Sequence, residues 1–173
     1  AGEPIPNVFT QPFWDFYIFI GGSGATLALV MLMSFSRSVH LKSIGRMSAV
    51  PGFFQINEPV IFGSPVVMNP TLFIPFVFAP VINATIAYFA VHVGFVGMGV
   101  ATTPWTTPAL IGASWGSGWT FAPVLLVIGL LILDLIIYFP FFKMFEKQML
   151  EQELPTTKDT KDEAQPSGEG VTA

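Results

Sequence analysis

Residues 119–142 read WTFAPVLLVIGLLILDLIIYFPFF, and Asp134 is the one charged residue among them. A helix of about 20 apolar residues is long enough to cross the roughly 30 Å hydrocarbon core of a bilayer. Trp119 stands at one end of the stretch, and Tyr138 and Lys143 stand at the other. Aromatic and basic residues gather in this way where a helix meets the two membrane interfaces. The stretch therefore predicts a transmembrane helix.

Two further stretches are long and apolar enough to span a membrane, residues 13–35 and 71–93. The first contains a glycine-rich run at 21–24, and small residues let neighbouring helices approach closely. The second contains Pro75 and Pro80, which membrane helices tolerate when neighbouring groups satisfy the freed carbonyls. We expect about three transmembrane helices in an all-α polytopic membrane protein.

The composition supports a membrane protein, with 52% hydrophobic and 10% charged residues and a mean hydropathy of +0.65. A soluble domain needs charged side chains spread over its surface, whereas Glu58 is the only charged residue between Arg46 and Asp134. The chain has no cysteine, so a disulfide, a thiolate nucleophile and a cysteine metal site are excluded within it.

The basic residues predict the orientation, because positive charge collects in short cytoplasmic loops. They fall in two groups, one after the first span and one after the third: Arg37, Lys42 and Arg46, then Lys143, Lys147, Lys158 and Lys161. We expect an outer N-terminus, a cytoplasmic loop at 36–50, an outer loop at 94–118 and a cytoplasmic C-terminus.

The chain divides into residues 1–153, which carry the spans, and a tail at 154–173. The tail is polar, contains proline and glycine and lacks apolar periodicity, so we expect it to be a disordered cytoplasmic end. The chain starts AGEP without an initiator methionine, and we interpret it as the C-terminal part of a longer protein.

Two segments fit neither a simple helix nor a simple loop. Residues 51–70 read PGFFQINEPVIFGSPVVMNP and residues 101–118 read ATTPWTTPALIGASWGSG. Both are too apolar for a solvated loop and too rich in proline and glycine for a regular helix. Irregular backbone at membrane depth is tolerated only where protein or a water-filled cavity covers it. We expect two re-entrant, hairpin-like segments that enter from opposite faces and meet near the middle of the membrane.

Glu58 is the strongest candidate for a functional residue. An acid in an otherwise uncharged membrane stretch must pair, protonate or face a polar cavity. Gln55 and Asn57 place amide groups beside it, and together the three resemble a cluster that binds hydroxyl groups. A structural acid that caps a helix is the alternative.

The stretch PGFFQINEPVIFGSPVVMNPTLFIPF resembles the Asn-Glu-Pro signature of a known family. That family is enzyme IIC, the membrane component of phosphotransferase systems for lactose, cellobiose and diacetylchitobiose. The blocks GSGATLAL, TTPWTTP and YFPFFKMFEKQ lie around it in the order expected of its members, and the resemblance covers residues 9–151.

The resemblance implies a sugar permease of a bacterial cell membrane. Such a permease is a multi-pass homodimer that binds a disaccharide and presents its 6-hydroxyl to the phosphocysteine of a cytoplasmic enzyme IIB partner. This chain would supply sugar binding and translocation and not the phosphocysteine, and the dimerising half would lie in a missing N-terminal part. Membrane lipid is an expected partner, whereas no cofactor, metal or nucleic acid is expected.

The resemblance also assigns roles to residues. Glu58 would hydrogen-bond sugar hydroxyls near the acceptor position, with Asn57 and Gln55 flanking it, and Gln55 stands where many members have Asn. Trp105 would be the aromatic platform for a pyranose ring, and a belt tryptophan at the membrane interface is its alternative. No catalytic residue is assigned in this chain, because the histidine of the family belongs to an earlier hairpin.

Other readings of the polar residues stay open. His40 is interpreted as a solvated residue and His92 as a structural residue. Neither is assigned as a phosphoacceptor. Asp134 suggests a helix-packing partner, and Asp15 is undecided. The alternative function is an ion-coupled secondary transporter or channel segment, in which Glu58 and Asp134 relay protons or cations. A third class is a membrane subunit with no ligand.

Overall fold

The computed structural model describes residues 10–97 and 103–163, with side chains to residue 153. All regular structure in these residues is helical, which confirms the predicted all-α class. The elements in chain order are α1 (Gln11–Phe13), the π-helix η1 (Trp14–Ile18), α2 (Leu27–Ser34), α3 (Val39–Phe53), α4 (Glu58–Gly63), α5 (Pro70–His92), α6 (Ala109–Gly116) and α7 (Ala122–Glu163).

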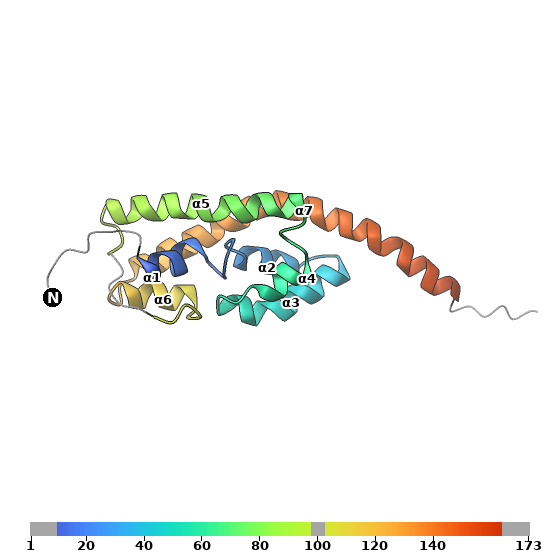
Figure 1. Cartoon of the computed structure of the whole chain (residues 1–173), viewed down its shortest axis with the longest axis horizontal. Coiled ribbons are helices and arrows are strands. Elements are labelled where there is room, and N and C mark those ends of the chain that lie inside the picture. The colour runs from blue at the N-terminus through green and yellow to red at the C-terminus, as the bar shows by residue number, and fades with distance from the viewer. Residues whose placement is uncertain (1–9, 98–102, 164–173) are drawn as a thin grey trace, which may run out of the picture.

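Helices α5 and α7 are the two described helices that are long and apolar enough to cross a membrane. They contain most of the predicted spans 71–93 and 119–142, and they pack against each other in the elongated bundle of Figure 1. Asn83 of α5 donates a hydrogen bond from Nδ2 to Oδ2 of Asp134 in α7 at 3.0 Å, and both side chains are fully buried. Asp134 is thus a helix-packing partner, as its apolar surroundings suggested.

The predicted span at 13–35 is broken into helical pieces and is not one continuous helix. Helix η1 ends at Ile18, and α2 begins at Leu27. Between them Gly21, Gly22 and Gly24 have φ angles of 81°, 100° and 83°, values in the left-handed region that glycine adopts without steric cost. The glycine run therefore interrupts the helix instead of only allowing close helix packing.

The predicted cytoplasmic segment at 36–50 is mostly helical, and its side of the membrane stays a prediction. Ser38 begins α3 as its N-cap, and its Oγ accepts the Leu41 N–H at 3.2 Å. Helix α3 then packs closely beside α2, and a Cβ at Gly45 would lie 2.4 Å from the backbone nitrogen of Ser34. The serine cap stabilises the start of this helix, and the glycine allows α3 and α2 to approach closely.

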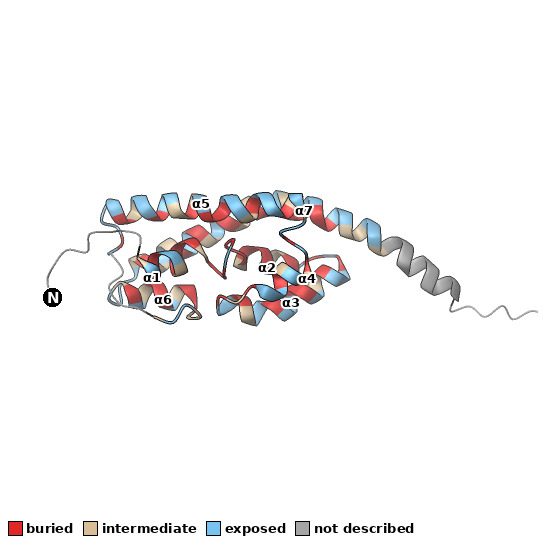
Figure 2. Ribbon diagram, in the orientation of Figure 1, coloured by how far each residue is buried: buried red, intermediate tan, exposed pale blue. Residues whose placement is uncertain are grey.

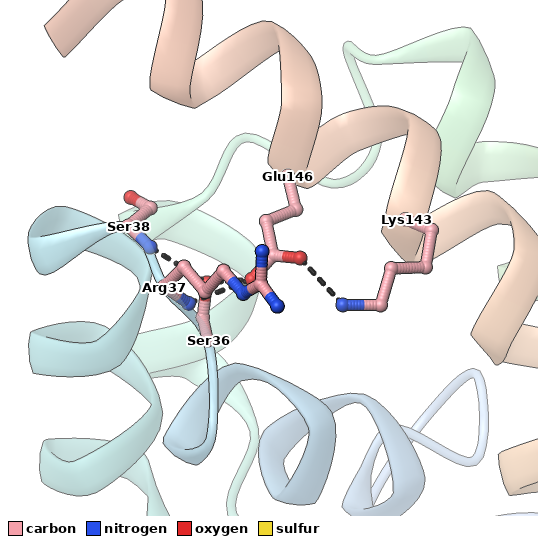
Figure 3. A network of polar contacts seen from close by, with 5 residues as sticks. All are labelled: Ser36, Arg37, Ser38, Lys143 and Glu146. Carbon is pink, nitrogen blue, oxygen red and sulfur yellow. Dashed lines mark hydrogen bonds and ion pairs between the residues drawn. The ribbon is translucent and has the colours of Figure 1, made fainter.

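A network of polar contacts ties the start of α3 to the far part of α7 (Figure 3). Glu146 is buried, with 4% of the residue exposed. Its Oε1 accepts Ser36 Oγ–H at 2.6 Å and the Arg37 N–H at 2.7 Å, and its Oε2 pairs with Lys143 Nζ at 2.7 Å. Glu153 accepts Ser38 Oγ–H at 2.6 Å further along α7.

Glu146 lies beyond the predicted end of the third span at 142. Burial raises the pKa of its carboxyl, but the hydrogen bonds from Lys143, Ser36 and the Arg37 backbone outweigh burial and lower that pKa to about 2. The charged form is therefore the one that the network stabilises.

The apolar core has two parts, and both reach α7. One lies around α2, α3 and α4 and includes Tyr138 and Phe142, and the other lies around η1, α5 and α6 and includes Phe16. Large apolar side chains such as Phe78 and Phe89 of α5 remain 58% and 60% exposed, and exposed residues line the outer side of α5 in Figure 2. Exposed apolar faces of this extent are typical of surfaces that lipid or another protein segment covers.

The boundary predicted at residue 153 is not the end of a helix, because α7 continues to Glu163. Extending an existing helix adds one hydrogen bond for each further residue that is fixed, whereas starting a new helix fixes several residues for its first hydrogen bond. The rest of the predicted tail, 164–173, lies outside the described residues, and its disorder stays a prediction.

Candidate functional site

A cavity of about 230 Å³ lies at the break between η1 and α2. Its lining comes from the broken helix, from the 51–70 segment and from the 101–118 segment. The lining residues are Asp15, Phe19, Gly22, Ser23, Gln55, Asn57, Glu58 and Trp105. All four residues predicted to bind sugar thus lie around one cavity, where the two unusual segments come together.

The 51–70 segment brings Gln55, Asn57 and Glu58 to the cavity through an interruption between two helices. Helix α3 ends at Phe53 and α4 begins at Glu58. Gln55 has a φ of 68° between them, a conformation that is uncommon for a residue other than glycine. The irregular backbone expected from the proline and glycine content therefore occurs here as a sharp turn.

The side chain of Gln55 holds the glycine turn in place. Its Oε1 accepts the N–H groups of Gly21 at 2.8 Å and Gly22 at 3.0 Å, and its Nε2 donates to the backbone carbonyl of Asp15 at 2.9 Å. The residue is 5% exposed. Both polar atoms of the Gln55 side chain, Oε1 and Nε2, thus already form hydrogen bonds to the backbone. A direct role of Gln55 in sugar binding stays a prediction.

Asn57 fixes the same turn from its other side. Its Nδ2 donates to the backbone carbonyl of Ser23 at 2.7 Å and to Ser23 Oγ at 3.3 Å. A Cβ at Gly22 would lie 2.6 Å from Cγ of Asn57, so the contact between these two residues requires glycine. No described donor contacts Oδ1 of Asn57, which leaves this oxygen to accept from a ligand.

Glu58 is exposed and is the first residue of α4. Within residues 10–97 and 103–153, no hydrogen bond or ion pair occupies its carboxylate, and the N-terminus of α4 has no side-chain cap. A negative charge in the first turn of a helix is favoured by the helix dipole. The carboxylate is therefore held in a favourable place with both oxygens open to a ligand.

Trp105 lies in the turn between Pro104 and Pro108, before α6, and is 53% exposed. The other two tryptophans of this region, Trp115 and Trp119, contact each other with ring centroids 5.5 Å apart and do not line the cavity. Trp105 is thus the tryptophan whose ring can cover a ligand at this site.

The cavity also includes residues to which the sequence assigned no role, Asp15, Phe19 and Ser23. The sequence left the role of Asp15, near the start of the predicted span at 13–35, undecided. In the structure the 13–35 stretch breaks at the glycine run, and Asp15 lines the same cavity as Glu58. The sequence features that could have indicated this part of the cavity are the glycine run at 21–24 and the distant Asn-Glu-Pro stretch. Only the folded chain shows that the two lie side by side.

The remaining polar candidates lie elsewhere. His40 is exposed, and its backbone N–H donates to Glu153. His92 is exposed and stacks on Tyr88 with ring centroids 5.9 Å apart. Among the described residues no group of His, Asp and Glu side chains is arranged to hold a metal ion.

A larger hollow of about 570 Å³ lies between η1 and α5. Its lining is apolar and includes Trp14, Ile18, Pro80 and Val81. Its described lining residues include no carboxylate or side-chain amide for a polyhydroxylated ligand, so the smaller cavity is the better candidate for a sugar.

Comparison with known proteins gives the family. The sequence profile of the family described as "Phosphotransferase system, EIIC" matches residues 1–80. The chain is 40% identical over 156 residues to the lichenan permease IIC component of Bacillus subtilis, covering 88% of this chain and 34% of that protein. It is 44% identical over 155 residues to the lactose-specific EIICB component of Staphylococcus epidermidis, covering 89% and 27%.

A solved structure is similar throughout most of the chain. The crystal structure of the transporter ChbC, the IIC component from the N,N'-diacetylchitobiose-specific phosphotransferase system, matches with a TM-score of 0.84 and 47% identity over 88% of this chain. The chain belongs to the enzyme IIC family. The suspected resemblance is therefore confirmed, and this enzyme IIC segment spans about a quarter to a third of the length of the relatives that it matches.

Proposed function

We propose that this enzyme IIC segment forms the sugar-binding part of a phosphotransferase-system permease and binds a disaccharide at the cavity of Glu58 and Trp105. The observation that carries the proposal is the convergence of a free carboxylate, an amide oxygen and an exposed tryptophan on one cavity. The names of the relatives specify lichenan, lactose and N,N'-diacetylchitobiose, which supports a saccharide ligand.

The chemistry of the cavity suits a pyranose ring. Hydroxyl groups of a sugar donate hydrogen bonds, and the Glu58 carboxylate and Asn57 Oδ1 are acceptors without described partners. The C–H face of the ring is apolar, and an aromatic plane such as that of Trp105 covers such a face. The volume of about 230 Å³ is below the roughly 300–1,000 Å³ typical of ligand pockets. We therefore expect it to hold one ring, with other parts of the permease completing the site.

The proposed setting is a multi-pass protein of the bacterial cell membrane with a cytoplasmic C-terminus. Helices α5 and α7 have the length and composition of spans, and the broken segment at 13–35 fits a discontinuous helix that lines a substrate site. The partners are an enzyme IIB on the cytoplasmic side, a second copy of the permease, and lipid over the exposed apolar faces. Phosphorylation would use the phosphocysteine of the enzyme IIB.

An ion relay through Glu58 and Asp134 has less support. Asp134 bonds Asn83 in the fully buried interface of α5 and α7, and it does not line the cavity that contains Glu58. A relay needs polar groups that connect its two acids.

The test uses a complete permease, either the full-length protein that carries this sequence or a chimera in which this chain replaces the matching part of ChbC. Membrane vesicles with phosphoenolpyruvate, the soluble phosphotransferase proteins and enzyme IIB should convert labelled disaccharide to sugar phosphate. A protonophore should leave this conversion unchanged. Uptake that needs no phosphoenolpyruvate and collapses with the protonophore would support the ion-coupled alternative.

A further inference from the structure

Asp15 is a second carboxylate at the proposed sugar site. It lies in the π-helix η1 and lines the same cavity as Glu58 and Trp105. The Gln11 side chain hydrogen-bonds its carboxyl, yet the oxygen Oδ2 is buried and has no hydrogen-bond partner among the described residues. A buried acceptor without a donor is costly unless a bound group supplies the donor.

The position of Asp15 is fixed by the turn that surrounds the cavity. Gln55 Nε2 donates to the backbone carbonyl of Asp15 at 2.9 Å, and Gln55 Oε1 binds the N–H groups of Gly21 and Gly22. One side chain therefore ties η1, the glycine turn and the α3–α4 turn to each other. π-Helical turns inside helical segments are frequent at functional sites.

We infer that Asp15 binds sugar hydroxyls together with Glu58. The inference rests on the proposed function and adds a ligand-binding carboxylate to it. Asp15 and Glu58 are two carboxylates that line one small cavity, and a carboxylate accepts hydrogen bonds from hydroxyl groups. The chemical class of ligand that fits both acids is a sugar with hydroxyl groups available to each of them.

The first test measures disaccharide binding to the complete permease and to its Asp15→Asn variant. The amide keeps the size of the side chain and removes its charge, so the dissociation constant should rise about 10- to 100-fold, as expected for the loss of a hydrogen bond to a charged group. Glu151→Gln is the matched control, because Glu151 is an exposed acid of α7 outside the cavity, and its affinity should equal that of the unmodified permease.

A second measurement separates direct contact from a structural role. A series of disaccharides that each lack one hydroxyl is bound to the unmodified permease, to Asp15→Asn and to Asp15→Glu. The hydroxyl that contacts Asp15 contributes affinity in the unmodified permease and contributes none in Asp15→Asn. In Asp15→Glu, which keeps the charge on a longer side chain, the contribution of this hydroxyl should change while those of the others are preserved.

The outcomes are distinct. An unmodified permease that binds no disaccharide overturns the proposed function itself. A permease that binds sugar, with the same affinity and the same dependence on every hydroxyl in both Asp15 variants, overturns only the role of Asp15. If Asp15→Asn does not fold, the hydroxyl series is measured on Asp15→Glu alone. A dependence on every hydroxyl that equals that of the unmodified permease would then overturn the role of Asp15.

Discussion

The side-chain oxygen of Gln55 accepts the backbone N–H of Gly21 at 2.8 Å across 34 residues of sequence. The same oxygen accepts the N–H of Gly22 at 3.0 Å. These bonds join the turn between α3 and α4 to the break in the first apolar stretch. They explain why an irregular backbone persists here, since the freed N–H groups have a buried acceptor.

Replacing Gln55 should therefore destabilise the fold. We expect Gln55→Ala to lower the free energy of unfolding by about 2 kcal/mol, because it leaves the N–H groups of Gly21 and Gly22 without their acceptor. Thermal unfolding of the purified complete permease measures this, with the exposed Gln152 changed to Ala as control. Gln55→Gly relieves the φ of 68° but also removes the amide. If Gln55→Gly is as stable as the unmodified permease or more stable, the backbone strain at position 55 costs more than the hydrogen bonds of the Gln55 amide contribute.

Trp105 should contribute sugar affinity by covering one face of a ring. We expect Trp105→Ala to weaken disaccharide binding by about 1–3 kcal/mol, and Trp105→Phe or Trp105→Tyr to keep most of the affinity. Trp115→Ala is the control, because Trp115 is similarly exposed but lies outside the cavity. Unchanged affinity together with lowered thermal stability in Trp105→Ala would instead indicate a tryptophan of the membrane interface.

The network at Glu146 should make stability depend on pH. The pKa of Glu146 falls from an ordinary value of 4.5 to about 2 in the folded state. Its contribution is therefore complete above about pH 4.5 and is lost as the pH falls toward about 2. We expect Glu146→Gln to lower stability by about 1–3 kcal/mol at neutral pH. The difference from the unmodified permease should shrink between about pH 4.5 and pH 2.

Glu151→Gln is the control for this experiment. Glu151 pairs with Lys147 at 4.0 Å, and the two side chains are 65% and 80% exposed, so its removal should change stability by less than about 0.5 kcal/mol. Denaturation curves for the three proteins at several pH values give the comparison. A Glu146→Gln difference that stays constant down to pH 2 would show that the charge of Glu146 is not what the network stabilises.

The proposed topology places residues 40 and 97 on opposite sides of the membrane. The chain has no native cysteine, and both positions are exposed, so His40→Cys and Gly97→Cys each place one reporter thiol in this part of the permease. A membrane-impermeant thiol reagent should label position 97 from outside and position 40 only after the cytoplasmic side is opened. Labelling of both positions from one face would contradict the three-crossing arrangement.

The long apolar stretches predicted much of the fold. The stretches 71–93 and 119–142 correspond to α5 and to the first part of α7, because length and hydropathy specify a helix without reference to its partners. The break within 13–35 was not predicted. Hydropathy does not report backbone φ, and the hydrogen bonds that stabilise the break come from Gln55 and Asn57, distant in the chain.

The candidate site was predicted in part for a similar reason. Glu58 was found because it is a lone charge in an apolar stretch, and the structure places it with Asn57, Gln55 and Trp105 at one cavity. Asp15 received no role, because its position at this cavity follows from a turn that only the folded chain forms. The sugar-binding roles of all of these residues stay predictions.

Equilibrium binding of the disaccharide to the complete permease and to its Glu58→Gln variant tests the central claim most directly. Glutamine keeps the shape of the side chain and removes the charge that accepts hydroxyl groups at the start of α4. We expect the unmodified permease to bind the sugar, and Glu58→Gln to lose binding while its expression, membrane insertion and thermal stability remain near normal. A Glu58→Gln variant that binds the disaccharide with the affinity of the unmodified permease would contradict the claim and make Glu58 a structural residue.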